Sequence, residues 1–338
     1  MTTYAYPTSA ELTSIAADFM GPMTKGPDVD PIFGYFPVVN VDNHLLEWEQ
    51  KDNYRGLQMV RGLNGEPGRV NPIGGKRFRM APGVYGEFMP IDEDELTRRR
   101  PWGEWTGHVN ITDLVTEKTE QLVTREVARI RKMNWDLAVA GTFSVVGPTG
   151  AILHTDSYTT QTAAAAVAWA TIATAAPLKD FRAAALLSRG HSSKFGGRAV
   201  AYANQVTVNA MLNNTNPNDI GGMRTLNGPF ALADVNKINL ANDVPRVEVM
   251  DDGYFDDAGV FQLFIPDGKV VIFGTRPGND PIGQYRHTRN ANNPNMAPGP
   301  YDIVYEREEP PKEIRVHRGQ NGGPIIWYPS AIIVLTVS

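Results

Sequence analysis

The sequence predicts an α+β protein that begins with a long extended segment and forms its folded body only afterwards. Residues 110–140 carry apolar side chains at three- and four-residue steps, the pattern of one amphipathic helix. The residues before this helix are interrupted by many prolines and glycines, which end any regular element that starts there. Short helical and extended patterns alternate after it. Because the first hundred residues have few ways to bury themselves, we interpret the chain as a subunit of an assembly.

The composition places the chain among globular proteins. It has 338 residues, of which 42% are hydrophobic and 20% are charged, enough for about two folded units. No uninterrupted apolar run reaches the ~18 residues of a membrane-spanning helix. The first residues lack the basic start and apolar core of a secretory signal. We therefore expect no membrane segment and no export.

The residue types present limit the chemistry that the chain can perform. It contains no cysteine, which excludes disulfides, thiol catalysis and cysteine-bound zinc. The six histidines occur singly, and the aspartate-rich residues 251–257 lack the spacing of a calcium loop. We predict no catalytic, cofactor or metal site, although carboxylate pairs distant in sequence remain open. The net charge of −5 argues against sequence-independent binding of nucleic acid.

The residues before the long helix divide into two parts. The first forty or so form an arm with a short expected helix from Ser9 to Met20, in which Ser9 is the expected N-cap. From His44 to Pro90, apolar and polar side chains alternate between glycines, which predicts a long two-stranded excursion. Because this segment has no core of its own, we expect it to pack on an adjacent subunit.

Charged residues cluster where they could contact neighbouring copies of the chain. An acidic run followed directly by three arginines precedes the long helix, and a second mixed cluster lies near residue 306. One interpretation is a set of solvated turns. The other is pairing of carboxylates with guanidinium groups between copies, which the forked arginine side chain favours. The candidate inter-subunit contacts are Lys76, Arg77, Arg79, Asp92, Glu93, Asp94, Glu95, Arg98, Arg99, Arg100, Glu306, Arg307, Glu308 and Glu309.

The region after residue 141 is expected to mix helices and strands. A hairpin is predicted at 142–153, with its turn at 147–150. The expected helices are the alanine-rich 160–176, then 178–187, 205–213 and 234–240. The expected strands are 199–203, 244–250, 260–265, 269–273, 301–305, 313–317 and 331–337. Pro266-Asp267-Gly268 is the predicted tight turn joining 260–265 to 269–273 in a small sheet.

Four stretches and their order along the chain suggest a known family. They are Leu96-Thr-Arg-Arg-Arg-Pro101, Leu122-Val-Thr-Arg-Glu-Val-Ala-Arg129, Phe264-Ile-Pro-Asp-Gly-Lys-Val-Val-Ile-Phe-Gly274 and Pro324-Ile-Ile-Trp-Tyr-Pro-Ser-Ala-Ile-Ile-Val334. With these stretches the chain resembles the major capsid proteins of tailed bacteriophages, and most closely the lambda-type major capsid (head) protein E family. The likeness covers most of residues 40–338.

The resemblance implies the tailed-phage major capsid fold, also called the Hong Kong ninety-seven phage fold. Its parts would be an N-terminal arm at 1–42, an extended loop at 43–108, a peripheral domain at 109–159 and 283–338 that contains the long spine helix, and an axial domain at 160–282. Copies would form pentamers and hexamers that close into an icosahedral shell around packaged double-stranded DNA. The chain would then be part of the capsid of a virion that is assembled in the host cytoplasm.

The resemblance also implies partners. These are further copies of the chain, a portal protein, an optional decoration protein, and packaged DNA in weak non-specific contact. A separate scaffolding protein is expected, because the sequence does not start with a charged helical scaffolding segment. No enzyme activity and no cofactor are implied. Two alternatives stay open: an encapsulin-like nanocompartment shell and a cytosolic α/β enzyme of unknown reaction.

Some members of this fold join subunits by an isopeptide bond between a loop lysine and an asparagine. The chain offers Lys76 and the asparagines of 290–295 for such a bond. Only Phe78 supplies apolar surface close to Lys76 in the sequence, whereas a nucleophilic amine needs a desolvated site. We therefore expect non-covalent contacts between subunits.

Overall fold

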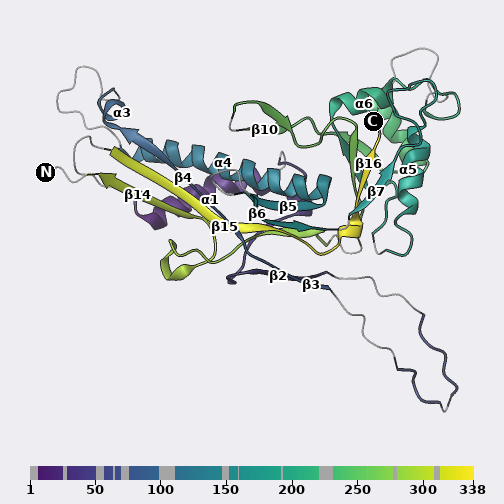
Figure 1. Ribbon diagram of the computed structural model, residues 1–338, viewed down its shortest axis with the longest axis horizontal. Helices are drawn as coiled ribbons and strands as arrows, with labels where there is room; N and C mark the ends of the chain where they lie inside the picture. The colour runs from purple at the N-terminus through teal and green to yellow at the C-terminus, as the bar shows by residue number, and fades with distance from the viewer. Residues whose placement is uncertain are drawn as a thin grey trace. The chain divides into compact units, whose positions relative to one another are not determined.

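The computed structural model describes residues 7–25, 29–50, 57–63, 65–69, 76–98, 111–146, 152–158, 160–191, 193–220, 231–256, 258–276, 280–307 and 313–338 (Figure 1). The chain forms two compact units, each built from separate stretches of the sequence. Unit 1 comprises residues 1–46, 79–134 and 283–325, and unit 2 comprises residues 47–78, 135–282 and 326–338.

Unit 1 is a sheet with helices on one face. Its elements are α1 (Ser9–Lys25), α2 (Ile32–Tyr35), β1 (Val38–Asn40), β4 (Gly83–Asp92), α3 (Glu93–Arg98), most of α4 (Ile111–Ala140), β13 (Gly283–His287), a 3-10 turn (Pro294–Met296), β14 (Tyr301–Arg307) and β15 (Glu313–Ile326). The strand order is β1-β13-β15-β14, and β4 also pairs with β15. The first half of β15 is therefore flanked by two antiparallel partners, β14 and β4.

The core of unit 1 lies between this sheet and its helices. Leu12 of α1 and Leu114 of α4 are buried together with Ile91, Ile314 and Val316 of the sheet. Helix α1 begins with a capping box, because the Thr8 and Glu11 side chains each bond the other residue's backbone N–H. Thr8, rather than the expected Ser9, is thus the N-cap; the Ser9 hydroxyl instead donates to the carbonyl oxygen of Asp302, at 2.6 Å.

Unit 2 contains a second five-stranded sheet, in the order β7-β16-β12-β8-β9. Its elements are most of β2 (Leu46–Gln50), most of β3 (Lys76–Met80), β5 (Thr142–Val146), β6 (Ile152–Ser157), β7 (Gln161–Ala164), α5 (Pro177–Leu186), β8 (Val200–Ala203), α6 (Gln205–Leu212), α7 (Leu232–Ala241), β9 (Arg246–Val249), β10 (Gly253–Phe255), β11 (Phe261–Leu263), β12 (Lys269–Phe273), a 3-10 turn (Pro329–Ala331) and β16 (Ile332–Thr336). Strands β2 and β3 pair with each other, as do β5 with β6 and β10 with β11.

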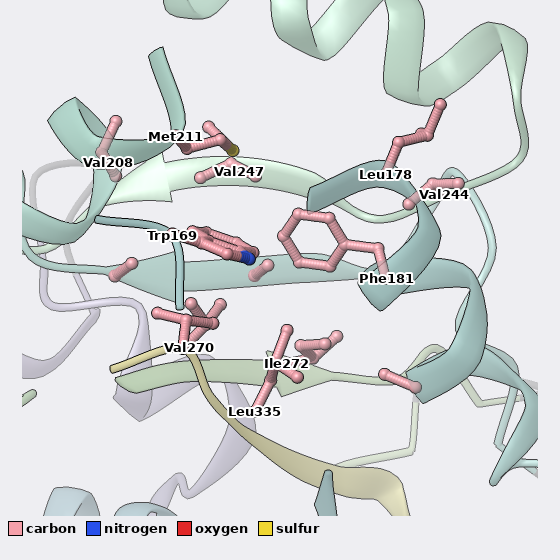
Figure 2. Close-up of a cluster of buried hydrophobic side chains, with 14 of the residues drawn as sticks. Trp169, Leu178, Phe181, Val208, Met211, Val244, Val247, Val270, Ile272 and Leu335 are labelled. Carbon is pink, nitrogen blue, oxygen red and sulfur yellow. The ribbon is translucent and has the colours of Figure 1, made fainter. Parts of the chain in front are cut away.

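Both faces of the central strands of unit 2 are buried. Figure 2 shows Phe181 of α5 and Met211 of α6 in the same cluster as Val270 and Ile272 of β12. Tyr202 of β8 and Phe273 of β12 lie on the opposite face of the sheet. Their rings meet Trp135 of α4 edge-on, at centroid distances of 5.9 and 6.0 Å. Burial on both faces explains why these strands are apolar at every position except Lys269 and Thr336, which lie at the ends of their strands.

Most of the expected elements are present. The long helix is confirmed as α4 and the hairpin as β5–β6, whose turn lies outside the described residues. Helices at 178–187, 205–213 and 234–240 are confirmed as α5, α6 and α7. The two-stranded excursion is confirmed only for β2 and β3, which enclose residues 51–75.

The helix predicted at 160–176 is wrong. Residues 161–164 instead form β7, parallel to β16, and the chain continues in turns. The backbone N–H groups of Ala165 and Trp169 donate to the carbonyls of Thr336 and Val337 at 2.8 and 2.9 Å, and the Trp169 indole N–H donates to Asp180 at 2.9 Å. Alanine is the best helix former, but helix propensity amounts to less than about 1 kcal/mol per residue, so pairing with an available sheet edge determines the structure here.

Two strand assignments also differ from the prediction. The strand at 261–263 pairs with β10 as a separate ribbon, so Pro266-Asp267-Gly268 turns the chain from this ribbon into β12 and does not close a hairpin. The closing strand, expected to group with 283–325, pairs as β16 with β12 and β7. The reason is that β15 ends at Ile326 and the 3-10 turn at Pro329–Ala331 redirects the chain before β16 begins.

The extended loop expected at 43–108 is shorter than predicted. Its residues 83–92 form β4, which pairs with β15 of the same chain over ten residues. Residues 93–98 form α3. The alternating pattern of 83–92 therefore belongs to a sheet whose one face is buried, and not to an excursion.

A buried ionic trio connects α4 to the sheet of unit 1. Arg318 of β15 donates to the carboxylate of Glu126 on α4, and its Nη1 donates to both carboxylate oxygens of Asp302 on β14, each at 2.7 Å. The side chains of these three residues are at most 6% exposed. Burial raises the pKa of Glu126 and of Asp302, and the Arg318 charge opposes both shifts. The trio is thus the polar centre of an otherwise apolar contact.

A second buried titratable side chain, His287, lies on β13. Neither of its ring nitrogens has a hydrogen-bond partner among the described residues, and its ring contacts Tyr285 edge to face at 5.3 Å. Burial, with a smaller effect of the Arg318 charge, lowers the pKa of His287 from 6.5 to about 3. The imidazole is therefore neutral in the folded protein at pH 7.

We predict that Arg318→Met lowers the free energy of unfolding by about 3–5 kcal/mol, because it leaves two buried carboxylates without their cation. The measurement is urea denaturation at pH 7. Arg125→Met is the matched control, since it removes the exposed Arg125–Glu87 pair and should cost ~0.2–1 kcal/mol. A loss below about 1 kcal/mol for Arg318→Met would contradict the assigned role of the trio.

We also predict a pH-dependent contribution to stability from His287. Since its pKa is about 3 in the folded chain and 6.5 without burial, the unfolded chain binds the extra proton first, and stability falls as the pH drops from 6.5 toward 3. Between pH 6.5 and pH 5 the loss is about 1.6 kcal/mol, because the unfolded histidine goes from half to almost fully protonated over this range. His287→Leu should remove this part of the pH dependence of the unfolding free energy. Equal pH dependence in the wild type and the variant would show that folding does not lower the pKa of His287.

Candidate assembly surface

The sheet of unit 1 has one buried face and one face that its helices leave uncovered. Along β15, Ile314, Val316 and Arg318 are buried, whereas the intervening Glu313 and Arg315 are only partly buried. The strand alternation therefore directs two kinds of side chain to opposite faces. We call the side of Arg315 the outer face.

Aromatic side chains gather on the outer face. His317 stacks on Phe88 of β4 at a centroid distance of 5.1 Å and meets Tyr305 of β14 edge-on at 4.9 Å. The Arg315 guanidinium carbon lies 5.0 Å from the centre of the Phe88 ring. Phe88 and Tyr305 remain 47% and 54% exposed. We call these four residues the aromatic cluster; large aromatic and arginine side chains that stay half exposed are typical of protein contact surfaces.

The electrostatics of the aromatic cluster favour a neutral histidine. Burial, and then the charge of Arg315, lower the pKa of His317. Arg315 also donates two hydrogen bonds to Glu313, at 2.9 and 2.8 Å, which lower the pKa of that carboxyl. The outer face thus combines a neutral aromatic centre with a fixed ion pair at one end.

Ion pairs within the chain fix the elements around this face. The Arg125 side chain of α4 forms two hydrogen bonds with Glu87 of β4, and the Arg131 Nε donates to Asp30 at 2.7 Å. Hydrogen bonds from Arg125 lower the pKa of Glu87. Near the start of α4, Lys118 pairs with Glu95 of α3 at 3.2 Å. These contacts connect α4 to β4, to the segment at Asp30 and to α3.

A second exposed surface lies beyond the ribbon formed by β2 and β3. The ribbon is closed by stacking of Trp48 on Phe78, at 5.4 Å between ring centroids, with Tyr158 in contact with both rings. Residues 57–63 lie beyond the ends of the two strands (Figure 1). Four of these seven residues are apolar and exposed: Leu57 by 97%, Met59 by 60%, and Val60 and Leu63 each by 100%. We call them the apolar tip.

The structure distributes the predicted charged contacts over three places. Lys76, Arg77 and Arg79 lie on β3, and Arg77 pairs with Glu47 of β2 at 3.1 Å. Asp92 ends β4; Glu93, Asp94, Glu95 and Arg98 lie on α3; and Glu306 and Arg307 end β14. The described residues do not include Arg99, Arg100, Glu308, Glu309 or the side chain of Arg98. Whether these residues contact another copy stays a prediction.

The register of β4 and β14 on β15 brings some of these charged residues together at one end of the outer face. Asp92 and Arg307 lie opposite Glu313 on either side of β15. An open hollow at this end is lined by Tyr305, Glu306, Arg307, Glu313 and Arg315. The basic residues Lys76, Arg77 and Arg79 are not part of this group, because β3 pairs with β2 in a separate two-stranded sheet.

Sequence reasoning missed the aromatic cluster and the ionic trio. Phe88 and Tyr305 are 217 residues apart, and only the pairing of both strands with β15 brings them near His317. Glu126 carried a usable signal, since it occupies the apolar stripe of the long helix between Leu122 and Ile130. A carboxylate in such a stripe requires a buried cation.

Two further findings concern the part of the chain that the structure describes. None of its helices is sufficiently long and apolar to span a bilayer. It also contains no group of three or more histidine, aspartate or glutamate side chains that could hold a metal ion.

Comparison with solved structures shows the fold. The chain is similar to a putative capsid protein of a prophage from E. coli CFT073, with a TM-score of 0.64 and 12% identity over 98% of this chain and 99% of that one. A phage-related protein from Bordetella bronchiseptica RB50 gives a TM-score of 0.57 and 11% identity, covering 98% and 97% of the two chains. The capsid of a native GTA particle gives 0.51 and 13% identity, covering 94% and 98%. The predicted α+β tailed-phage capsid fold is confirmed.

Comparison with protein families and with curated proteins gives one match. No curated protein matches the chain. The family described as phage major capsid protein E matches residues 33–337. Because this match covers almost the entire length, the chain belongs to the phage major capsid protein E family.

Proposed function

We propose that the chain is the major capsid protein of a tailed phage, and that its copies form pentamers and hexamers which close into an icosahedral shell around double-stranded DNA. The observation that carries this proposal is the family match over residues 33–337. The fold shared with phage and prophage proteins supports it. The match favours a viral shell over both an encapsulin-like compartment and an enzyme.

The outer face and the apolar tip support a role in assembly. Each exposes apolar side chains that a solitary soluble chain would bury, such as Val60 and Leu63 of the tip and Phe88 and Tyr305 of the cluster. We infer that the tip of one copy lies on the outer face of an adjacent copy. The strands β2 and β3 then act as a spacer, and the expected extended loop is reduced to the residues between them.

The remaining assignments complete the proposal. Residues 1–42 would be the arm, 109–159 with 283–325 the peripheral domain, and 160–282 with the closing strand β16 the axial domain. A scaffolding protein, a portal protein and an optional decoration protein would be further partners in the host cytoplasm. A net charge of −5 fits a wall that contacts packaged DNA only weakly.

Contacts between copies are proposed to be non-covalent. Among the asparagines available for an isopeptide bond, Asn290 is only 3% exposed. Its carboxamide oxygen accepts the backbone N–H of Asn292 at 2.9 Å. The Asn293 amide donates to the carbonyls of Ala297 and Gly299. These side chains stabilise their own loop.

The proposal predicts that the purified chain, with a scaffolding protein if required, forms closed particles visible by negative-stain microscopy and eluting at megadalton size. Val60→Asp combined with Leu63→Asp should reduce particle yield at least about tenfold, because charges would replace two fully exposed apolar contacts. Far-UV circular dichroism should be unchanged, since neither side chain contributes to a core.

Gln58→Asp is the matched control, because it introduces a carboxylate into the same segment at a polar position. It should assemble normally. Normal particles from the Val60/Leu63 variant would contradict the role of the tip, and a wild-type chain that stays a small oligomer under all conditions would contradict the shell itself. A deletion is less suitable as a test, because removing residues 61–86 would also remove β3 and the start of β4.

A further inference from the structure

A two-stranded ribbon of unit 2 presents an aromatic pair to solvent. Phe255 of β10 and Phe261 of β11 are register partners, and their rings meet edge to face at a centroid distance of 5.4 Å. They are 72% and 47% exposed, and the adjacent Val260 is 54% exposed. On the other face of the ribbon, Tyr254 stacks on Phe264 at 5.9 Å. The ribbon therefore has one face packed on its own chain and one apolar face left open.

The tip of this ribbon is held in a fixed shape. The Asp256 carboxylate accepts the backbone N–H groups of Ala258 and Val260 at 3.0 and 2.9 Å, and the Gln262 side-chain amide at 3.1 Å. Gly259 adopts the positive φ of +78° that the turn requires. A tip built this way presents Phe255 and Phe261 without first having to be ordered, which favours binding.

The ribbon is also acidic. Residues 247–268 contain six aspartates and glutamates and no lysine or arginine. Asp251 and Asp252 are exposed at its base. A partner surface should therefore combine apolar side chains with positive charge.

The exposed surface at the C-terminal end of α5 has this combination. We call Arg182 and Leu186 of the helix, with Leu187 and Arg189 just after it, the α5 stripe. Leu186 and the following Leu187 are 51% and 41% exposed. Arg182 and Arg189 are exposed beside them, and neither forms an ion pair with any residue of the described chain. Residues 177–194 contain four lysines and arginines, and their single carboxylate, Asp180, is buried.

The ribbon and the C-terminal end of α5 lie at opposite edges of one sheet, whereas Arg182, one turn earlier in the helix, donates to the side chain of Asn242 ahead of β9. The sheet runs in the order β7-β16-β12-β8-β9, and the ribbon begins four residues after β9 ends. The end of α5 is joined to the other edge, where the Gln161 side chain of β7 donates to the carbonyl of Leu187 at 3.2 Å. Surfaces placed at opposite edges are suited to head-to-tail contact, which closes into a ring when copies are related by rotation.

We propose that the β10–β11 ribbon of one copy docks on the α5 stripe of the next copy, so that Phe255 and Phe261 cover Leu186 and Leu187. The acidic base of the ribbon then faces Arg182 and Arg189. This inference rests on the proposed shell function, because it needs copies arranged in rings. It adds a second contact that does not involve the apolar tip.

Disulfide trapping tests the contact directly, because the chain has no cysteine of its own. Particles of the Phe255→Cys/Leu187→Cys variant, assembled under reducing conditions and then oxidised, should give a ladder reaching pentamer and hexamer mass on a non-reducing denaturing gel. Tyr254→Cys/Leu187→Cys is the matched control, since Tyr254 lies on the opposite face of the ribbon. The control should remain mainly monomeric.

The outcomes separate this proposal from the shell proposal. Intact particles of the Phe255/Leu187 variant that yield no ladder, or a control that yields an equal ladder, overturn the ribbon contact alone. Absence of particles from the wild-type chain contradicts the proposed function instead.

Charge reversal gives an independent decision if the cysteine variant does not assemble. Arg182→Glu/Arg189→Glu should lower particle yield at least tenfold with unchanged circular dichroism. Adding Asp251→Lys/Asp252→Lys should restore the yield to within about threefold of the wild type. Normal yield from the arginine variant, or loss that the aspartate changes do not reverse, overturns the proposal.

Discussion

Unit 1 depends on one buried guanidinium. Arg318 bonds one oxygen of the Glu126 carboxylate on α4 and both oxygens of the Asp302 carboxylate on β14, so that a helix and two strands meet at a single charge. A buried cation of this kind tolerates no displacement, because moving it would leave Glu126 and Asp302 uncompensated. The trio therefore fixes the register of β15, and through strand alternation it also determines which side chains reach the outer face. His317 and Arg315 are partly exposed on the outer face because Arg318 lies on the buried face.

The local part of this fold was predictable from sequence, and the long-range part was not. Helix α4 was evident because its apolar period extends over thirty residues and needs no information from elsewhere. Residues 161–164 were misassigned because the helix preference of alanine is overridden by a parallel strand partner 172 residues away. The outer face forms because β4 and β14 both pair with β15. A pairing between strands this far apart in the sequence cannot be read from a local residue pattern. The family was recognisable because the order of elements survives where individual motifs are weak.

Charges and apolar side chains serve different purposes in this chain. Several of the charged residues expected to bridge copies already have a partner in their own chain, as Arg77 has Glu47 and Glu95 has Lys118. Such groups can add to a contact between copies only by sharing or exchanging that partner, and exposed pairs are weak in any case. Exposed apolar side chains do not form ion pairs, so a contact with another copy does not require them to give up a charged partner in their own chain. A shell built from such modest contacts gains strength by repetition, and each contact stays weak enough to be corrected during assembly.

Helix α4 has a consequence for how the chain unfolds. Its first residues, including Leu114, belong to the core of unit 1, whereas Trp135 near its end is buried against Tyr202 and Phe273 in unit 2. The boundary between the units thus falls within one uninterrupted run of helical hydrogen bonds. Fraying at either end shortens the one helix that both cores share, and a shorter helix is less stable because fewer turns offset the cost of nucleation. Although the contacts define two units, we expect a change that melts one end of the helix to lower the stability of both.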